Sequence, residues 1–154
     1  MGTDEAAGQG LGVPTLFVAK SKTLQDWGHG VGVTKFLFKV GVDDGSGDDA
    51  VATMNAEKAA GQDDWKLLGQ KETDLADADA LARVARREQQ LDPDFYPRIR
   101  GAHGVFKVKL SNVENDMMIR AALANENQQL KNLKAKDKDI ADYLMRRADE
   151  DRGS

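Results

Sequence analysis

The residues most able to do chemistry in this chain form a short block of arginines that ends in an acid. Arg83, Arg86 and Arg87 are followed at once by Glu88. Arg83 and Arg87 are four residues apart, so they share one face of a helix. A carboxylate beside arginines is the arrangement expected of a divalent-metal ligand next to a phosphate-binding patch. The block fits a salt-bridged surface helix as well, and the residues alone leave both interpretations open.

The loop that follows this block gathers aromatic, basic and imidazole side chains. The sequence DPDFYPRIRGAHG spans 92–104 and contains two prolines, which exclude a regular helix or strand. Its two aromatic rings, together with Arg98 and Arg100, suit base stacking and phosphate contact. His103 is the better of the two histidines as a catalytic candidate, although neither has a second histidine at metal-ligand spacing. The same loop also fits a stiff connection that anchors an aromatic ring in the core.

Several familiar chemistries have no motif in this chain. There is no cysteine, which excludes disulfides, zinc–thiolate sites and a thiol nucleophile. Walker and Gly-x-Ser-x-Gly motifs are missing. The glycine-rich run at 28–32 is expected in a loop between two strands, where it lacks the helix N-terminus that binds phosphate. The aspartates at 43–49 do not have the spacing of an EF-hand loop.

Charge is distributed unevenly along the chain, although the net charge is only −4. Residues 15–40 hold four lysines and one acid, whereas residues 43–79 hold eleven acids and three lysines. Residues 81–109 hold five arginines and two lysines against three acids. If the two basic segments pair in one sheet, they form a positive face that could meet phosphate. Alternatively, these bases neutralise acidic neighbours on a solvated surface.

Hydrophobic periodicity predicts an α+β fold with a small mixed sheet of about four strands. The expected strands are 15–20, 35–42, 65–70 and 105–110, and the expected helices are 50–60, 74–90 and 113–147. The resulting order is β-β-α-β-α-β, followed by a long C-terminal helix. We expect residues 1–13 to be disordered, residues 14–112 to form the domain, and residues 113–150 to form the helix.

The C-terminal helix carries the clearest periodic pattern. Apolar residues recur at alternating spacings of four and three, with two polar interruptions: Ile119, Leu123, Glu126, Leu130, Leu133, Asp137, Ile140 and Leu144. A helix of about 35 residues would span roughly 50 Å, which exceeds a small domain. It must therefore bend or break, dock in part on its own sheet, or meet a second copy or a partner helix through residues 119–144.

Targeting signals are missing from the sequence. No apolar run is long enough for a membrane span, and the N-terminus has neither the basic start nor the apolar stretch of a secretory signal. We therefore expect no membrane partner and a cytoplasmic location.

The order of elements and four short segments resemble the GIY-YIG nuclease superfamily, in particular its divergent viral and bacterial branch. The segments are TLFVAK at 15–20, FLFKVGV at 36–42, the Arg/Glu helix and GVFKV at 104–108, so the resemblance covers residues 15–110. In that family, strand tyrosines activate and position water, a helix arginine holds the scissile phosphate, and a glutamate binds magnesium. Here the tyrosine positions are Phe17 and Lys39, and the helix at 50–60 has no arginine.

The resemblance therefore implies a degenerate domain that binds or weakly processes nucleic acid, and it leaves open whether the protein is an enzyme. It implies Glu88 as a ligand for Mg²⁺, with Glu88 and His103 as the catalytic candidates. The expected phosphate-binding residues are Lys39, Arg83, Arg87, Arg98 and Arg100. The alternative hypothesis is a protein-interaction or regulatory module that acts through the C-terminal helix without catalysis.

Overall fold

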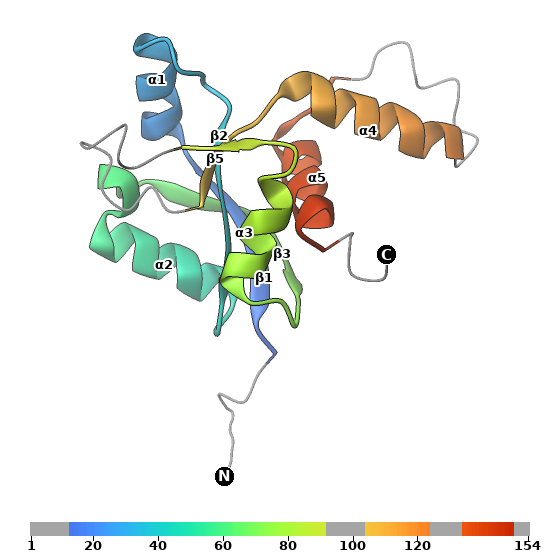
Figure 1. Ribbon diagram of the computed structural model, residues 1–154. Coiled ribbons are helices and arrows are strands. Elements are labelled where there is room, and N and C mark those ends of the chain that lie inside the picture. Colours follow the sequence, from blue (N-terminus) through green and yellow to red (C-terminus); the bar gives the residue numbers. More distant parts are fainter. Residues whose placement is uncertain (1–12, 92–103, 124–133, 150–154) are drawn as a thin grey trace.

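The protein has an α+β fold built on a five-stranded sheet (Figure 1). The computed structural model describes residues 13–91, 104–123 and 134–149. The strands are β1 (Thr15–Ser21), β2 (Leu37–Asp43), β3 (Trp65–Glu72), β4 (Gln89–Gln90) and β5 (Val105–Lys107), arranged in the order β3-β1-β2-β5-β4. The predicted class and the four predicted strands are confirmed. The described pairings are all antiparallel, rather than mixed, and β4 is an additional short strand.

Helices cover both faces of the sheet. They are α1 (Lys22–Gly30), α2 (Gly47–Glu57), α3 (Asp77–Val84), α4 (Leu110–Leu123) and α5 (Asp137–Asp149), with a single 3-10 turn at Ala59–Gly61. Strand alternation divides the core into two layers, because successive side chains point to opposite faces. Leu16, Val18, Phe38 and Val40 pack with α3 and α5, whereas Phe17, Ala19 and Leu37 pack with α1 and α2.

Residues 22–30 form a helix where the sequence predicts a glycine-rich loop. Ser21 caps α1, since its Oγ accepts a hydrogen bond from the Leu24 N–H at 3.1 Å. Gly28 is needed for packing and not for a turn, because a Cβ at this position would lie 2.2 Å from the carbonyl oxygen of Thr34. The glycines suggested a loop because glycine is favoured in turns. Glycine is also favoured where two backbone segments come into close contact, and that is its role at Gly28.

The predicted long C-terminal helix consists of two helices in the described residues. Residues 134–136, which directly precede α5, are not helical. α5 docks on the sheet, with Ile140 and Leu144 only 2% and 0% exposed, whereas Ile119 and Leu123 of α4 are 60% and 81% exposed. The apolar residues of the heptad pattern therefore lie in two environments. Those of α5 are buried in the core, whereas those of α4 are exposed.

Figure 1 shows α4 extending away from the sheet while α5 lies against it. Asp116 and Arg146 form an ion pair that joins the two helices. In the described part of the chain, no helix is long and apolar enough to cross a membrane. Residues 1–12 lie outside the described residues, so the prediction of disorder at the N-terminus stays a prediction.

Candidate functional site

The C-terminal end of α3 displays three arginines because the helix buries its opposite side. Ala80, Leu81 and Val84 are at most 5% exposed in the core. The chain then turns tightly, and the N–H groups of Arg87 and Glu88 both donate to the Val84 carbonyl at 3.0 Å. The arginine side chains that remain on the outer side are Arg83, Arg86 and Arg87.

These three arginines meet a fourth from the C-terminal helix. Arg83, Arg86, Arg87 and Arg147 line one pocket of about 220 Å³, which we call the arginine pocket. Among the described residues, no acidic side chain lines it. The Nη1 atom of Arg83 is buried and has no hydrogen-bond partner among the described residues. The pocket therefore offers guanidinium donors and a concentrated positive charge.

Glu88 lies beneath this pocket and is only 2% exposed. Its Oε1 accepts a hydrogen bond from the Lys109 N–H at 2.6 Å, and its Oε2 accepts from Asn112 Nδ2 at 2.8 Å. Oε2 also accepts from the Tyr143 hydroxyl at 2.7 Å. Both carboxylate oxygens are thus used to connect the end of α3 to α4 and α5.

Tyr143 links Glu88 to Arg147, which is one of the residues that line the arginine pocket. Burial raises the pKa of Tyr143, and the hydrogen bond to the Glu88 carboxylate raises it further, so the hydroxyl keeps its proton and donates to Glu88. The guanidinium carbon of Arg147 lies 5.8 Å from the centre of the Tyr143 ring. This distance allows a cation–π contact that orients Arg147.

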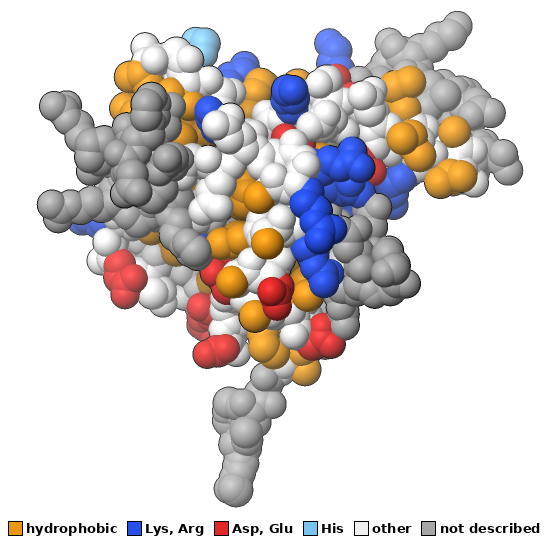
Figure 2. Space-filling view, in the orientation of Figure 1, with side chains coloured by type: hydrophobic (Ala, Val, Ile, Leu, Met, Phe, Trp, Pro, Cys, Tyr) orange, Lys and Arg blue, Asp and Glu red, His pale blue; other side chains and the backbone are white. Residues whose placement is uncertain are grey.

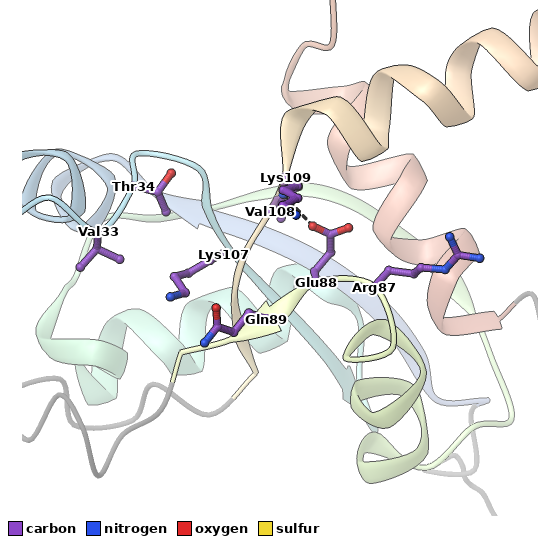
Figure 3. A pocket seen from close by; sticks show the side chains of 8 residues that line it. All are labelled: Val33, Thr34, Arg87, Glu88, Gln89, Lys107, Val108 and Lys109. Atoms are coloured by element: carbon purple, nitrogen blue, oxygen red, sulfur yellow. Dashed lines mark hydrogen bonds between the residues drawn. The ribbon is translucent and has the colours of Figure 1, made fainter.

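Two larger hollows adjoin the arginine pocket, and both include Arg87 in their lining. One, of about 450 Å³, is lined by Arg87, Asn112, Asn115, Asp116, Ile119, Tyr143 and Arg147. The other, of about 350 Å³, is lined by Val33, Thr34, Arg87, Glu88, Gln89, Lys107, Val108 and Lys109 (Figure 3). Figure 3 shows Glu88 directed toward the Lys109 backbone and Arg87 directed away from it.

The surface around these hollows is basic and polar. Figure 2 shows a run of lysine and arginine side chains over the region of α3 and α5, with acidic side chains gathered lower on the same face. Among the described residues that line the three hollows, the acids are the buried Glu88 and the half-buried Asp116, which is paired with Arg146. A positive area therefore exists on a protein whose net charge is −4.

Of the basic segment at 15–40, Val33 and Thr34 line one of these hollows, whereas Lys39 lines none of the three. A Cβ at Gly104 would lie 2.7 Å from Lys39 Nζ and 3.4 Å from a methyl carbon of Leu81, so the ammonium group lies near α3. Burial lowers the pKa of Lys39, while the negative charge of Asp77 acts against that shift. Asp77 begins α3, whereas Arg87 follows its end, and the helix between them is about 12 Å long at 1.5 Å per residue.

The structure therefore brings Arg83 and Arg87 together at one pocket, buries Glu88 directly after them in the chain, and places Lys39 outside the lining of that pocket. Arg98, Arg100 and His103 lie outside the described residues. Sequence analysis missed Arg147, which is sixty residues from Arg87 in the chain. The only signal was its position four residues after Tyr143, the spacing at which two helix side chains meet.

Residues singled out by the family resemblance lie elsewhere in the sheet. Phe17 is 4% exposed, and its ring would be 3.0 Å from a Cβ at Gly41, the residue paired with it on β2. Neither Phe17 nor Lys39 lines the arginine pocket. In the described ranges, no three His, Cys, Asp or Glu side chains gather in a way that could hold a metal ion. Glu88 as a magnesium ligand stays a prediction.

Comparison of the chain with protein-family models, curated proteins and solved structures finds no match. Function must therefore be inferred from the residues themselves.

Proposed function

We propose that this protein binds nucleic acid through phosphate groups, on the surface centred on the arginine pocket. The observation that carries the proposal is the meeting of Arg83, Arg86 and Arg87 with Arg147 in one pocket, which no acidic side chain lines in the part of the chain that the structure describes. Guanidinium groups present planar pairs of donors that match the oxygens of phosphate, and they stay charged at every physiological pH.

The supporting residues favour a fixed site over a set of solvated surface charges. Arg147 lies over the ring of Tyr143, whose hydroxyl is held by the buried carboxylate of Glu88. An arginine that is already oriented loses less conformational freedom when it binds an anion. Glu88 in this proposal is a positioning residue that acts through Tyr143.

An extended ligand is favoured by the hollows on either side. Lys107 and Lys109 lie along one, and Asn112 and Asn115 along the other, so donors continue beyond the arginine pocket in both directions. A polymer with a phosphate at every nucleotide can use such a series of donors, whereas one small anion cannot. Lys39 is not included in the proposed surface.

Fluorescence anisotropy with single- and double-stranded oligonucleotides at about 50 mM salt, where phosphate contacts are strongest, tests the proposal. We expect Arg87→Gln to weaken binding about tenfold, because a charge-assisted hydrogen bond is lost at the residue shared by all three hollows. Lys39→Gln and Lys66→Gln are matched controls that also remove one positive charge. Lys66 is exposed on β3, the strand at the other edge of the sheet from β4. Equal losses for all three variants, or no binding by the wild type, would contradict the proposal.

Cleavage of the bound strand is the further prediction of the family resemblance, with Mg²⁺ at Glu88 and with His103. An oligonucleotide cleavage assay with and without Mg²⁺ tests it. Activity lost in both Glu88→Gln and His103→Gln would support the predicted roles. Strand binding without cleavage would leave the protein as a binding domain.

A second candidate function rests on α4. Met118, Ile119 and Leu123 are 43%, 60% and 81% exposed, which is an unusual number of large apolar side chains for one short helix. A partner protein or a second copy that covers them would account for this exposure. Sedimentation of the full chain and of Leu123→Glu tests self-association, which predicts a larger species only for the wild type.

A further inference from the structure

We propose that the arginine pocket holds a terminal phosphate monoester, so that the protein recognises a phosphorylated end of a nucleic-acid strand. This inference rests on the proposed function and adds the part of the ligand that this pocket selects. Three observations carry it: the size of the pocket, the charge of its walls and the buried donor of Arg83.

The size of the pocket suits a single small group. At about 220 Å³ it is smaller than both adjoining hollows, and it lies below the roughly 300–1,000 Å³ of pockets that enclose whole small-molecule ligands. A phosphate fits such a space, while the nucleoside attached to it must lie outside. An internal phosphodiester has a strand leaving in two directions, whereas a monoester has only one.

The charge of the walls suits a dianion better than a monoanion. All the described residues that line the pocket are arginines, and four like charges close together repel one another. A phosphate monoester carries a charge of about −1.5 to −2 at pH 7 and three terminal oxygens. A diester carries one negative charge and two such oxygens. The monoester therefore offsets more of the repulsion and accepts more hydrogen bonds.

Arg83 supplies a donor that this ligand would satisfy. Its Nη1 atom is buried and, in the part of the chain that the structure describes, has no hydrogen-bond acceptor. A buried charged donor without an acceptor is costly, and an anion oxygen in the pocket removes that cost. Arg83 and Arg87 both line the pocket and can hold the anion together.

The rest of the strand has a suitable exit. The hollow of about 450 Å³ shares both Arg87 and Arg147 with the arginine pocket, so the two are continuous. Asn115 in that hollow provides an uncharged donor for the next nucleotide, and the Tyr143 and Ile119 side chains provide apolar area. The monoester would occupy the pocket, and the strand would leave along α4.

The test compares single strands of one sequence, about 15 nucleotides long, that carry hydroxyls at both ends, a 5′-phosphate or a 3′-phosphate. We expect one phosphorylated strand to bind about tenfold more tightly than the hydroxyl-ended strand, and the two phosphorylated strands show which end is used. Lowering the pH from about 7.5 to about 5.5 should shrink this preference, because a phosphate monoester loses its second charge near pH 6 while arginine does not titrate.

Variants distinguish the contribution of the arginine pocket to binding from that of the rest of the basic surface. Arg83→Gln should abolish the preference for the phosphorylated end while hydroxyl-ended strands still bind, and Arg83→Lys should restore only part of it, because lysine lacks the planar fork. Lys107→Gln should weaken all strands equally. Circular dichroism checks that each variant is folded. Equal affinity for all strands in the wild type would overturn this inference and leave the proposed function standing, whereas no binding to any strand would overturn both.

Discussion

At the scale of single residues, Glu88 has a sequence context that suggests a catalytic role, and it has a structural role in the fold. Its position after three arginines matches a metal ligand, yet in the structure it is buried and accepts hydrogen bonds from a backbone N–H, an amide and a phenol. A fully used carboxylate of this kind fixes three elements relative to one another.

We expect Glu88→Gln to destabilise the protein by about 1–3 kcal/mol, because the amide nitrogen cannot accept a hydrogen bond and leaves a buried donor unsatisfied. Tyr143→Phe, which removes only the donor at that one bond, should cost about 1 kcal/mol. Urea denaturation measures both. Glu72→Gln is the matched control, because Glu72 is an exposed acid at the end of β3. A loss in Glu88→Gln no larger than in the control would show that the network contributes little.

At the scale of elements, α1 is the part of the fold that sequence analysis missed. Three glycines within five residues normally indicate turns, but two of them lie inside α1. Ser21 and Asp64 decide the outcome, because Asp64 accepts hydrogen bonds from Ser21 Oγ and from the N–H and Oγ1 of Thr23. Burial by itself would raise the pKa of the Asp64 carboxyl. The hydrogen bonds from Ser21 and Thr23 together have the larger effect, so the pKa is lowered.

Two glycines of this helix predict opposite results when each is changed to alanine. Gly28→Ala should destabilise the protein by about 1–3 kcal/mol, as overpacked sites do, because the new Cβ would collide with the Thr34 backbone. Gly30→Ala should be neutral or stabilise by up to about 1 kcal/mol, since no atom lies within 4 Å of its Cβ and alanine favours helix. Thermal denaturation of the two variants measures the difference. Similar changes in both would indicate that residues 28–30 are not packed as a helix.

At the scale of the whole molecule, the basic area forms from segments that are distant in the chain. The sheet joins the segments 15–40 and 81–109, since β2 pairs with β5. The two basic segments do not combine at the arginine pocket, because Lys39 lies near Asp77 at the start of α3 and does not line the pocket. The missing positive charge is supplied by α5 instead, through Arg147.

A local basic area on an acidic protein predicts a strong dependence of binding on salt. If the four arginines contact about four phosphates, raising the salt from about 50 to about 200 mM should weaken single-strand binding roughly fiftyfold. Removing one of these arginines should reduce the slope of log affinity against log salt by about one contact. Titrations at four salt concentrations measure both slopes. Binding that does not change with salt would indicate that phosphate contacts are not its basis.

The sequence by itself determined the fold class, the four main strands and the helical character of the C-terminal segment, because these depend on patterns within about ten residues. Alternation in FLFKVGV predicts β2, but burial along the strand does not alternate, because helices cover both faces of the sheet. Local patterns also predicted one helix over 74–90 with Arg83 and Arg87 on a shared face, but α3 ends at Val84 and β4 takes Gln89–Gln90. The two arginines line one pocket because the chain turns after the helix.

Only the tertiary structure decided what those elements meet. Whether the heptad pattern at 119–144 forms one helix or two depends on the free energy of docking α5 against the sheet, which no local spacing encodes. The buried position of the Glu88 side chain depends on its hydrogen bond from Tyr143. The arginine pocket depends on Arg147, which is sixty residues from Arg87 in the chain. Such contacts arise from packing between distant segments, so they become visible only when the chain is folded.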